Sequence, residues 1–338
     1  MTPRLPETGH LCPTGALTFD RITGALTGST GREALLVQAL RAGARISSNW
    51  SYRGFAAGCR LLRPFAPDRT IQIRLTPDAT FSFPFADGYW SLLLDPHYSY
   101  ERDINLFFRS VADADYTLVD CGANFGYWST LVTSQLYGSH ASIAIEPSSR
   151  NFAILSANAR LNGGRFQPLH YAIGAEAGTA RLSGSKHEAM SIADSISGNS
   201  GDGEDVAVIP LDSLIGTSLN PNHRHVIKLD VEGVEIAALR GGTKLLETDC
   251  VLICEDHGND RNHTISRHIL EQTQLKLFCF DPLSRRFEHL ENLSALDRIK
   301  TSTNWGYNIL ATRSPYWQER IEAIDADKIR DSGGRPLI

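Results

Sequence analysis

The chain has 338 residues, of which 42% are hydrophobic, and a formal net charge of −5. This length is enough for one large domain, or for one domain with a smaller attachment, each burying its own core. The mildly negative charge argues against a protein that works chiefly by binding the phosphates of nucleic acid.

The first 115 residues or so combine a helix with a hairpin. The segment "REALLVQALRAGARI" (residues 32–46) has helical spacing, and "TIQIRLTPDATFSFPF" (residues 70–85) alternates apolar and polar residues around the turn formers Pro77 and Asp78. We predict a smaller α+β attachment over residues 1–115, with a role in substrate binding. Flat aromatic rings that could line an acceptor pocket are Trp50, Tyr52, Tyr89, Trp90, Tyr98 and, far downstream, Trp305.

Strand-like and helix-like segments alternate from residue 116 onward, which is typical of an α/β domain with a mostly parallel sheet and helices on both faces. The expected strands are residues 117–121, 141–146, 166–173, 225–231, 250–255, 275–280 and 306–312. The expected helices are residues 127–136, 149–162, 234–247 and 264–274. We predict a Rossmann-like domain over residues 116–315 and a C-terminal helix or tail over residues 316–338. The polar, glycine-rich stretch 183–205 is a candidate lid.

The segment "DCGANFG" predicts a ligand-binding turn, because an open parallel sheet binds its ligand where the first strand meets the next helix. Asn124 stands where a dinucleotide fingerprint needs its middle glycine, so a pyrophosphate cradle has little support. Glu146, followed by Pro147, ends the next strand and can accept both hydroxyls of a ribose. A nucleoside without phosphates indicates S-adenosylmethionine. The alternatives are an NAD-dependent oxidoreductase and a non-catalytic nucleotide-binding protein.

Several segments together resemble the FkbM-type family of S-adenosylmethionine-dependent methyltransferases. These are "VDCGANFGYWS", "IEPSSRNFAILSANARLN", "AIG", "IPLDSL", "IKLDVEGVEIAALRGG" and "NILAT", spread between Tyr89 and Thr312. The resemblance implies the class I methyltransferase fold, with a seven-stranded sheet whose last strand is antiparallel, and methylation of hydroxyl groups on sugars, glycolipids or polyketide-like molecules. It also implies Asp120, Gly122, Asn124 and Gly126 for the cofactor turn, Glu146 for the ribose, and the backbone around Ala172 and Ile173 for the adenine. We further expect Ala123, Phe125, Pro147 and Asp230 to bind the cofactor.

Methyl transfer to oxygen requires mainly that the nucleophile be positioned and lose its proton. His257 is the preferred general base, because an imidazole can accept a proton near neutral pH. Asp230 and Glu232, which follow the fourth expected strand, are the other catalytic candidates and could orient His257, contact the hydroxyl or face the sulfonium. All three could instead have structural roles, with the two acids stabilising a helix start.

The same strand ends carry side chains that suit a hard divalent cation, so magnesium or calcium is a less favoured alternative. These side chains are Asp230, Glu232, Glu255, Asp256 and His257. Lys228, on the same strand as Asp230, could pair with a carboxylate or contact the cofactor.

The six cysteines form no C-x-x-C pair, so we expect a reducing compartment and no zinc. The amino-terminal residues show no leader, and no apolar run is long enough to span a bilayer. We therefore expect a cytoplasmic enzyme that acts on a small molecule or glycan, binds no nucleic acid and does not insert stably into membranes.

Overall fold

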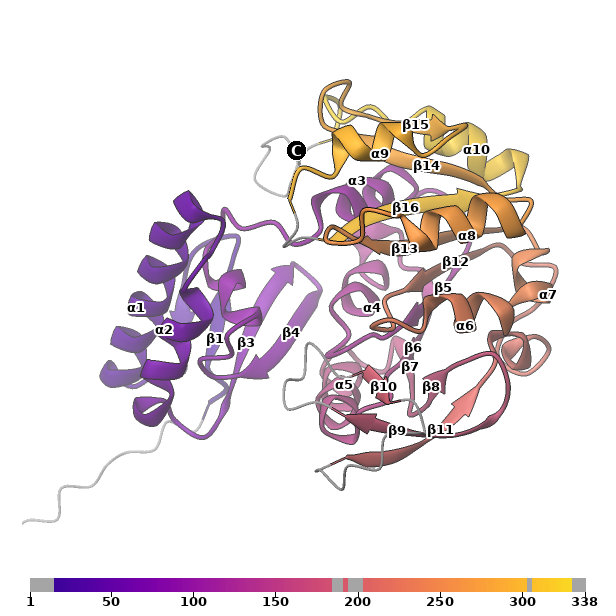
Figure 1. The fold of residues 1–338 in the computed structure, drawn as a ribbon. Helices are drawn as coiled ribbons and strands as arrows, with labels where there is room; N and C mark the ends of the chain where they lie inside the picture. The colour runs from indigo at the N-terminus through magenta and orange to yellow at the C-terminus, as the bar shows by residue number, and fades with distance from the viewer. Residues whose placement is uncertain (1–14, 184–190, 194–202, 303–305, 330–338) are drawn as a thin grey trace, which may run out of the picture. The chain divides into compact units, whose positions relative to one another are not determined.

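The computed structural model describes residues 15–183, 191–193, 203–302 and 306–329, drawn in colour in Figure 1. The chain divides into two compact units: a smaller one of Met1–Arg74 and Ser82–Tyr98, and a larger one of Leu75–Phe81 and Ser99–Ile338. The larger unit thus begins before the boundary expected near residue 115. Trp305, the end of the tail and most of the stretch 183–205 lie outside the described residues.

The smaller unit combines a four-stranded sheet with helices. The sheet has the order β2-β1-β3-β4, with β1 (Thr18–Asp20), β2 (Leu26–Thr27), β3 (Thr70–Thr76) and β4 (Ala79–Pro84). The α-helices are α1 (Gly31–Ser47) and α2 (Phe55–Leu62), and the 3-10 turns are η1 (Ser48–Trp50), η2 (Arg63–Phe65) and η3 (Trp90–Leu94). The expected helix and hairpin are therefore both present, although β3 and β4 share residues with both units.

Helix α1 begins at a capping box. The Thr30 hydroxyl accepts a hydrogen bond from the Glu33 amide at 3.2 Å, and the Glu33 carboxylate accepts one from the Thr30 amide at 2.7 Å. Two of the amides that a helix start leaves unpaired are thereby satisfied.

The larger unit is built on a sheet of eight described strands in the order β15-β14-β16-β13-β12-β5-β6-β7. Its strands are β5 (Thr117–Cys121), β6 (Ala141–Ile145), β7 (Phe166–Leu169), β12 (His225–Leu229), β13 (Cys250–His257), β14 (Lys276–Asp281), β15 (Arg286–Leu290) and β16 (Gly306–Thr312). Strand β16 is antiparallel to both of its neighbours. The sheet thus has the expected mostly parallel α/β arrangement, with one strand more than the expected seven, because β15 adds a hairpin partner to β14.

A smaller sheet, in the order β10-β9-β11-β8, accompanies the main one. Its strands are β8 (Ala172–Ile173), β9 (Gly178–Ser183), β10 (Ser191–Ala193) and β11 (Glu204–Ile209). The expectation of one strand over residues 166–173 was wrong: β7 pairs with β6 in the main sheet, whereas β8 pairs with β11.

Helices cover both faces of the main sheet (Figure 1). They are α3 (Arg102–Ser110), α4 (Tyr127–Val132), α5 (Ser149–Leu161), α6 (Glu235–Arg240), α7 (Thr243–Leu246), α8 (Thr264–Gln272), α9 (Ser294–Ile299) and α10 (Pro315–Glu322), with the 3-10 turns η4 (Gln135–Tyr137) and η5 (Leu211–Leu214). Residues of α6 to α9 share one apolar core with the sheet, and α5 packs against β6 and β7 in another.

The expected helix over residues 234–247 is broken into α6 and α7 at Gly241 and Gly242. A Cβ atom at Gly241 would lie 2.1 Å from the carbonyl oxygen of Gly174, so no side chain fits where these segments meet. No helix in the described part of the chain combines the length and the apolar character needed to cross a bilayer.

Candidate active site

The turn between β5 and α4 is held in an unusual backbone shape. Gly122, Asn124 and Gly126 all have positive φ, at 76°, 52° and 84°. The amides of Gly122 and Ala123 both donate to the carbonyl of Ile145, at 2.9 and 3.0 Å. This arrangement ties the turn to the end of β6 and explains why two of its positions are glycine.

Gly122 also lies directly against the segment that follows β12. A Cβ atom at this position would come within 1.8 Å of the carbonyl oxygen of Asp230. The expected cofactor turn and the expected catalytic acid therefore belong to two loops that touch through their backbones.

Glu146 comes immediately after β6 and accepts three hydrogen bonds. Its Oε2 accepts from the Asn124 amide at 2.9 Å, and its Oε1 accepts from the Ser148 amide at 3.0 Å and from Asn151 Nδ2 at 3.2 Å. A carboxylate offers about four acceptor sites, so capacity remains for a hydroxyl. Burial raises the pKa of Glu146 to about 7, although these donors oppose the shift.

The other expected cofactor residues lie around this turn in different settings. Asp120 is buried, and its Oδ2 accepts from the Ser129 hydroxyl at 2.8 Å, so its side chain supports the start of α4. The carbonyl of Pro147 lies 2.9 Å from His170 Nε2. Ala172 and Ile173 are buried in the smaller sheet, where they pair with Val208 and Ile209 of β11.

A buried lysine lies at the centre of the carboxylates near the ends of β5, β12 and β13. Lys228 Nζ is 2.9 Å from Asp230 Oδ2 and 3.9 Å from Glu101 Oε2. Burial disfavours the charged form of Lys228, but the surrounding carboxylates outweigh this effect and raise its pKa. Burial also raises the pKa of Glu101 to about 7, despite the opposing charge of Lys228.

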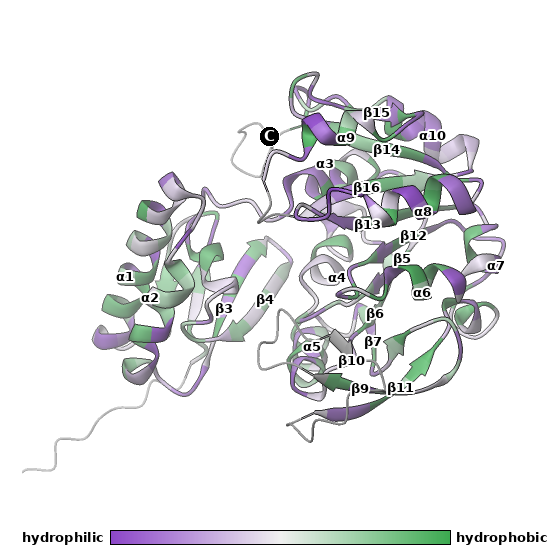
Figure 2. Cartoon of the chain, in the orientation of Figure 1, coloured by the Kyte–Doolittle hydropathy of each residue, from purple (hydrophilic) through white to green (hydrophobic). Residues whose placement is uncertain are grey.

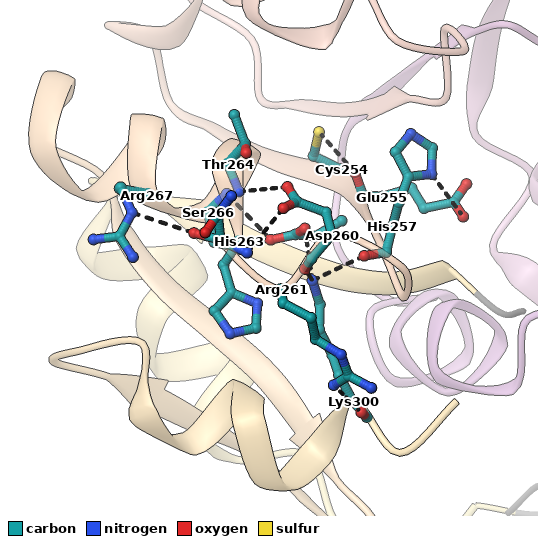
Figure 3. Close-up of polar contacts among 12 residues, drawn as sticks. Cys254, Glu255, His257, Asp260, Arg261, His263, Thr264, Ser266, Arg267 and Lys300 are labelled. Atoms are coloured by element: carbon teal, nitrogen blue, oxygen red, sulfur yellow. Dashed lines mark hydrogen bonds and ion pairs between the residues drawn. The ribbon is translucent and has the colours of Figure 1, made fainter. Parts of the chain in front are cut away.

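His257 has a carboxylate beside it at the end of β13. Its Nδ1 lies 3.8 Å from Glu255 Oε1, and Figure 3 shows the two side chains together. Burial, reinforced by the negative charges of Asp230 and Glu101, raises the pKa of Glu255 to about 8. The His257 side chain is 38% exposed, so solvent or a ligand can reach the imidazole.

Asp256 points to the opposite face of the sheet from Glu255, as side chains alternate along a strand. Its Oδ1 pairs with Lys300 Nζ at 2.7 Å, and both side chains are fully buried. The Lys300 ammonium also donates to the carbonyls of His257 and Asp260, at 3.1 and 3.3 Å (Figure 3). Lys300 thereby fixes the backbone that carries His257.

The acids proposed as metal ligands do not gather around one point. Asp256 forms a buried ion pair with Lys300, and Glu232 is exposed and has a positive φ of 52°. Among the residues that the structure describes, no group of three or more histidine, cysteine, aspartate or glutamate side chains could hold a metal ion.

Glu101 lies among these candidate site residues, although the sequence did not point to it. It precedes α3, has a positive φ of 39°, and accepts a hydrogen bond from the Trp128 indole as well as facing Lys228. Asp103, in the first turn of α3, accepts from Asn308 Nδ2 at 3.3 Å. No motif marks these acids, because only the folded chain brings α3 to the strand ends.

A pocket of about 430 Å³ opens elsewhere in the larger unit, away from the strand ends just described. It is lined by residues of α6, α7 and α8 together with Arg313, which follows β16. None of the expected site residues lines it, so we assign no step of the chemistry to this pocket.

Comparisons with known proteins find one family model and several solved structures to which this chain is similar. Residues 120–277 match the model of the methyltransferase FkbM domain. No curated protein gives a significant match. Among solved structures, an FkbM methyltransferase from Methylobacillus flagellatus KT is 17% identical, with a TM-score of 0.38 over 58% of this chain and 43% of that protein, which is less than half its length.

Two further solved structures are similar at lower identity. Precorrin-6y C5,15-methyltransferase from Geobacter metallireducens GS-15 is 14% identical, with a TM-score of 0.34 over 63% of this chain and 87% of that one. P. horikoshii TYW2, in complex with MeSAdo, is 12% identical, with a TM-score of 0.36 over 73% of this chain and 71% of that one.

Proposed function

We propose that this chain, whose residues 120–277 match the model of the methyltransferase FkbM domain, methylates a hydroxyl group using S-adenosylmethionine. The acceptor is a sugar, a glycolipid or a polyketide-like small molecule. We propose oxygen as the atom that receives the methyl group because His257 pairs with Glu255 at the end of β13. A hydroxyl must lose a proton as it is methylated, and this pair can accept it.

The residues around the β5–α4 turn fit the nucleoside part of this cofactor. Glu146 retains acceptor capacity for a ribose hydroxyl, and its bond from the Asn124 amide places it against the glycine turn. S-adenosylmethionine supplies a methyl carbon already activated by a sulfonium. The carboxylates of Asp230 and Glu101 give the neighbouring strand ends the negative potential that suits a cationic group.

His257 is the group that takes the proton from the acceptor in this proposal. Ionised Glu255, 3.8 Å away, stabilises the imidazolium that forms, and Lys300 holds the main chain of His257 in place. The carboxylates around Lys228 would repel a phosphate backbone, which supports a small-molecule or glycan acceptor rather than a nucleic acid.

Calorimetric titration with S-adenosylhomocysteine and, separately, with NAD tests the cofactor. We expect binding of the first alone, weakened roughly ten- to a hundredfold in Glu146→Ala, because hydrogen bonds to a charged group contribute about 1.5–3 kcal/mol. Exposed Glu291→Ala is the matched control and should bind as wild type. Binding of NAD alone would refute the methyltransferase proposal.

The acceptor is tested by incubating the protein and S-adenosylmethionine with a panel of hydroxylated sugars, lipid-linked sugars and polyketides. Mass spectrometry should find a single added methyl group that resists mild base, as an ether does and an ester does not. Transfer to nitrogen or to a carboxylate would contradict the choice of a hydroxyl while leaving the methyltransferase assignment intact.

A further inference from the structure

Helix α1 of the smaller unit has two apolar stripes on different sides. The buried stripe consists of Val37, Leu40 and Ala44. The second stripe consists of Leu35, Ala39, Ala42 and Ile46, all of them exposed. Its spacing of four, three and four residues keeps these side chains on one face of the helix. A soluble helix normally presents polar residues there, and this second stripe is not part of the unit's buried core.

Large apolar side chains are also exposed on the elements that follow α1. Trp50 in η1, Leu61 in α2 and Phe65 in η2 are 63%, 76% and 58% exposed. Five of the eight exposed large hydrophobic residues in the described part of the chain therefore lie between residues 31 and 65, a segment we call the helical layer. Figure 2 shows hydrophobic and hydrophilic stretches side by side along α1 and α2. A concentration of this kind marks an interaction surface.

The helical layer is strongly basic, although the whole chain has a net charge of −5. It contains six arginines against one acid, Glu33, which is a net charge of +5. Glu33 is buried and pairs with Arg69. Arg45 has a partner in Asp95 at 3.8 Å. Four exposed arginines have no ion pair with any residue that the structure describes: Arg32, Arg53, Arg60 and Arg63.

We propose that the helical layer docks the protein on the surface of an anionic lipid bilayer. Exposed Leu, Ile, Trp and Phe side chains partition into the boundary between headgroups and acyl chains, while arginines attract anionic headgroups. A second copy of the chain fits this surface poorly, because two layers of charge +5 would repel each other. Nucleic acid would attract the arginines but offers nothing to the aliphatic stripe. Docking of this kind is peripheral and inserts no helix.

Vesicle sedimentation of the full chain tests this surface. Vesicles of phosphatidylcholine with about a third phosphatidylglycerol should bind at least tenfold more protein than pure phosphatidylcholine vesicles at low salt, because each arginine at an anionic surface strengthens binding roughly fivefold. High salt should reduce the difference. Equal binding to both compositions, or none to either, would overturn the proposal.

Matched variants separate the apolar and the charged contributions. Leu61→Ser should weaken binding, whereas Leu283→Ser, which alters a leucine of similar exposure (78%) in the larger unit, should not. Arg60→Gln with Arg63→Gln should reduce binding roughly 25-fold, whereas the exposed pair Arg240→Gln with Arg313→Gln should leave it unchanged. Equal losses in the variants and in their controls would contradict a surface on the helical layer.

Trp50 provides a direct signal of contact with lipid. Its emission should shift to shorter wavelength on addition of the anionic vesicles, and the shift should be absent in Trp50→Phe. Light scattering after size-exclusion chromatography tests whether a second copy of the chain binds the helical layer instead. If Leu61→Ser abolishes a dimer and the wild type ignores vesicles, the layer is an interface between copies and the bilayer proposal fails.

Discussion

His257 and Glu255 form the pair of side chains on which the proposed chemistry depends. The sequence predicts only His257 in this role, and it gives Glu255 as a possible metal ligand. The structure places its Oε1 3.8 Å from the Nδ1 atom of His257, and Gly306 of β16 lies against the same carboxylate, so that a Cβ atom at Gly306 would be 1.5 Å from Glu255 Oε1. The glycine thus leaves the room that Glu255 occupies.

Replacement of His257 by alanine should lower turnover by about 10²–10⁴-fold, the usual contribution of a general base, while leaving S-adenosylhomocysteine binding unchanged. The wild-type rate should rise between pH 7 and 9, because the pKa of Glu255 is about 8 and its ionised form favours proton transfer to His257. Assays of methyl transfer at several pH values, with calorimetry, check both points. His289→Ala, which alters an exposed histidine in β15, is the control; wild-type turnover in His257→Ala would remove this residue as the base.

The candidate site residues predicted from the sequence share one property: each follows a strand that its own apolar pattern reveals. Gly122, Glu146, Asp230 and His257 are of this kind. Glu101 is not, because it precedes a helix in a region that the sequence assigned to the attachment. Its contact with Lys228 depends on how α3 packs, which no local pattern encodes.

Among the structural elements, the β5–α4 turn shows how closely two loops can approach. We expect Gly122→Ala to destabilise the protein and to abolish cofactor binding, because its Cβ would collide with the backbone of Asp230. Gly163→Ala is a close control: Gly163 has a similar φ of 70° but nothing lies within 4 Å of its added Cβ. That control should lose only the cost of the left-handed conformation, about 1–2 kcal/mol.

Denaturant unfolding and calorimetry on both variants measure this difference. If Gly122→Ala lost no more stability than Gly163→Ala and still bound S-adenosylhomocysteine normally, the approach of the two loops would not require glycine at position 122.

Strand β13 is anchored by the buried pair of Asp256 and Lys300. Lys300→Met should reduce the free energy of unfolding by about 3–5 kcal/mol, because it leaves a buried carboxylate without its partner. Adding Asp256→Asn should recover part of the loss. For comparison, Arg267→Met breaks an exposed pair with Glu271 and should cost about 0.3–0.5 kcal/mol. Similar losses of unfolding free energy in both single variants would show that the buried pair stabilises the protein no more than the exposed pair does.

The order of the elements was more predictable than their boundaries. Hydrophobic runs located every strand of the main sheet except β15, whose short, mixed sequence gives no such signal. Tertiary contacts accompany the other differences: the carbonyl of Gly174 lies against Gly241 at the break between α6 and α7, and β8 pairs with β11 instead of continuing β7.

Over the whole molecule, buried glutamates control how stability depends on pH. The folded chain raises the pKa of Glu101 and Glu146 to about 7 and that of Glu255 to about 8, from an ordinary value of 4.5. Between the ordinary pKa of 4.5 and these raised values, the folded state binds more protons than the unfolded state, so stability falls as pH rises. Burial acts in the opposite sense on His225, lowering its pKa to about 4 from an ordinary value of 6.5, so its contribution raises stability with pH and is nearly complete by about pH 7.5.

We therefore expect the free energy of unfolding to fall between pH 6.5 and 8.5, with a slope of at most about 1.4 kcal/mol per pH unit for each proton. Glu255→Gln should flatten this slope and stabilise the protein at pH 8, at the expense of turnover. Urea unfolding across this range measures the effect, with exposed Glu291→Gln as control. An unchanged slope in Glu255→Gln would mean that this carboxyl does not titrate as proposed.

The alternation of Glu255 and Asp256 along β13 also limits how the gene can vary. Deletion of one codon before Glu255 would shift the rest of the strand by one position, so that Asp256 would take the place of Glu255 and His257 would lie where Asp256 now pairs with Lys300. We expect lineages of this domain to tolerate amino-acid replacements on β13 far more readily than single-residue changes in its length.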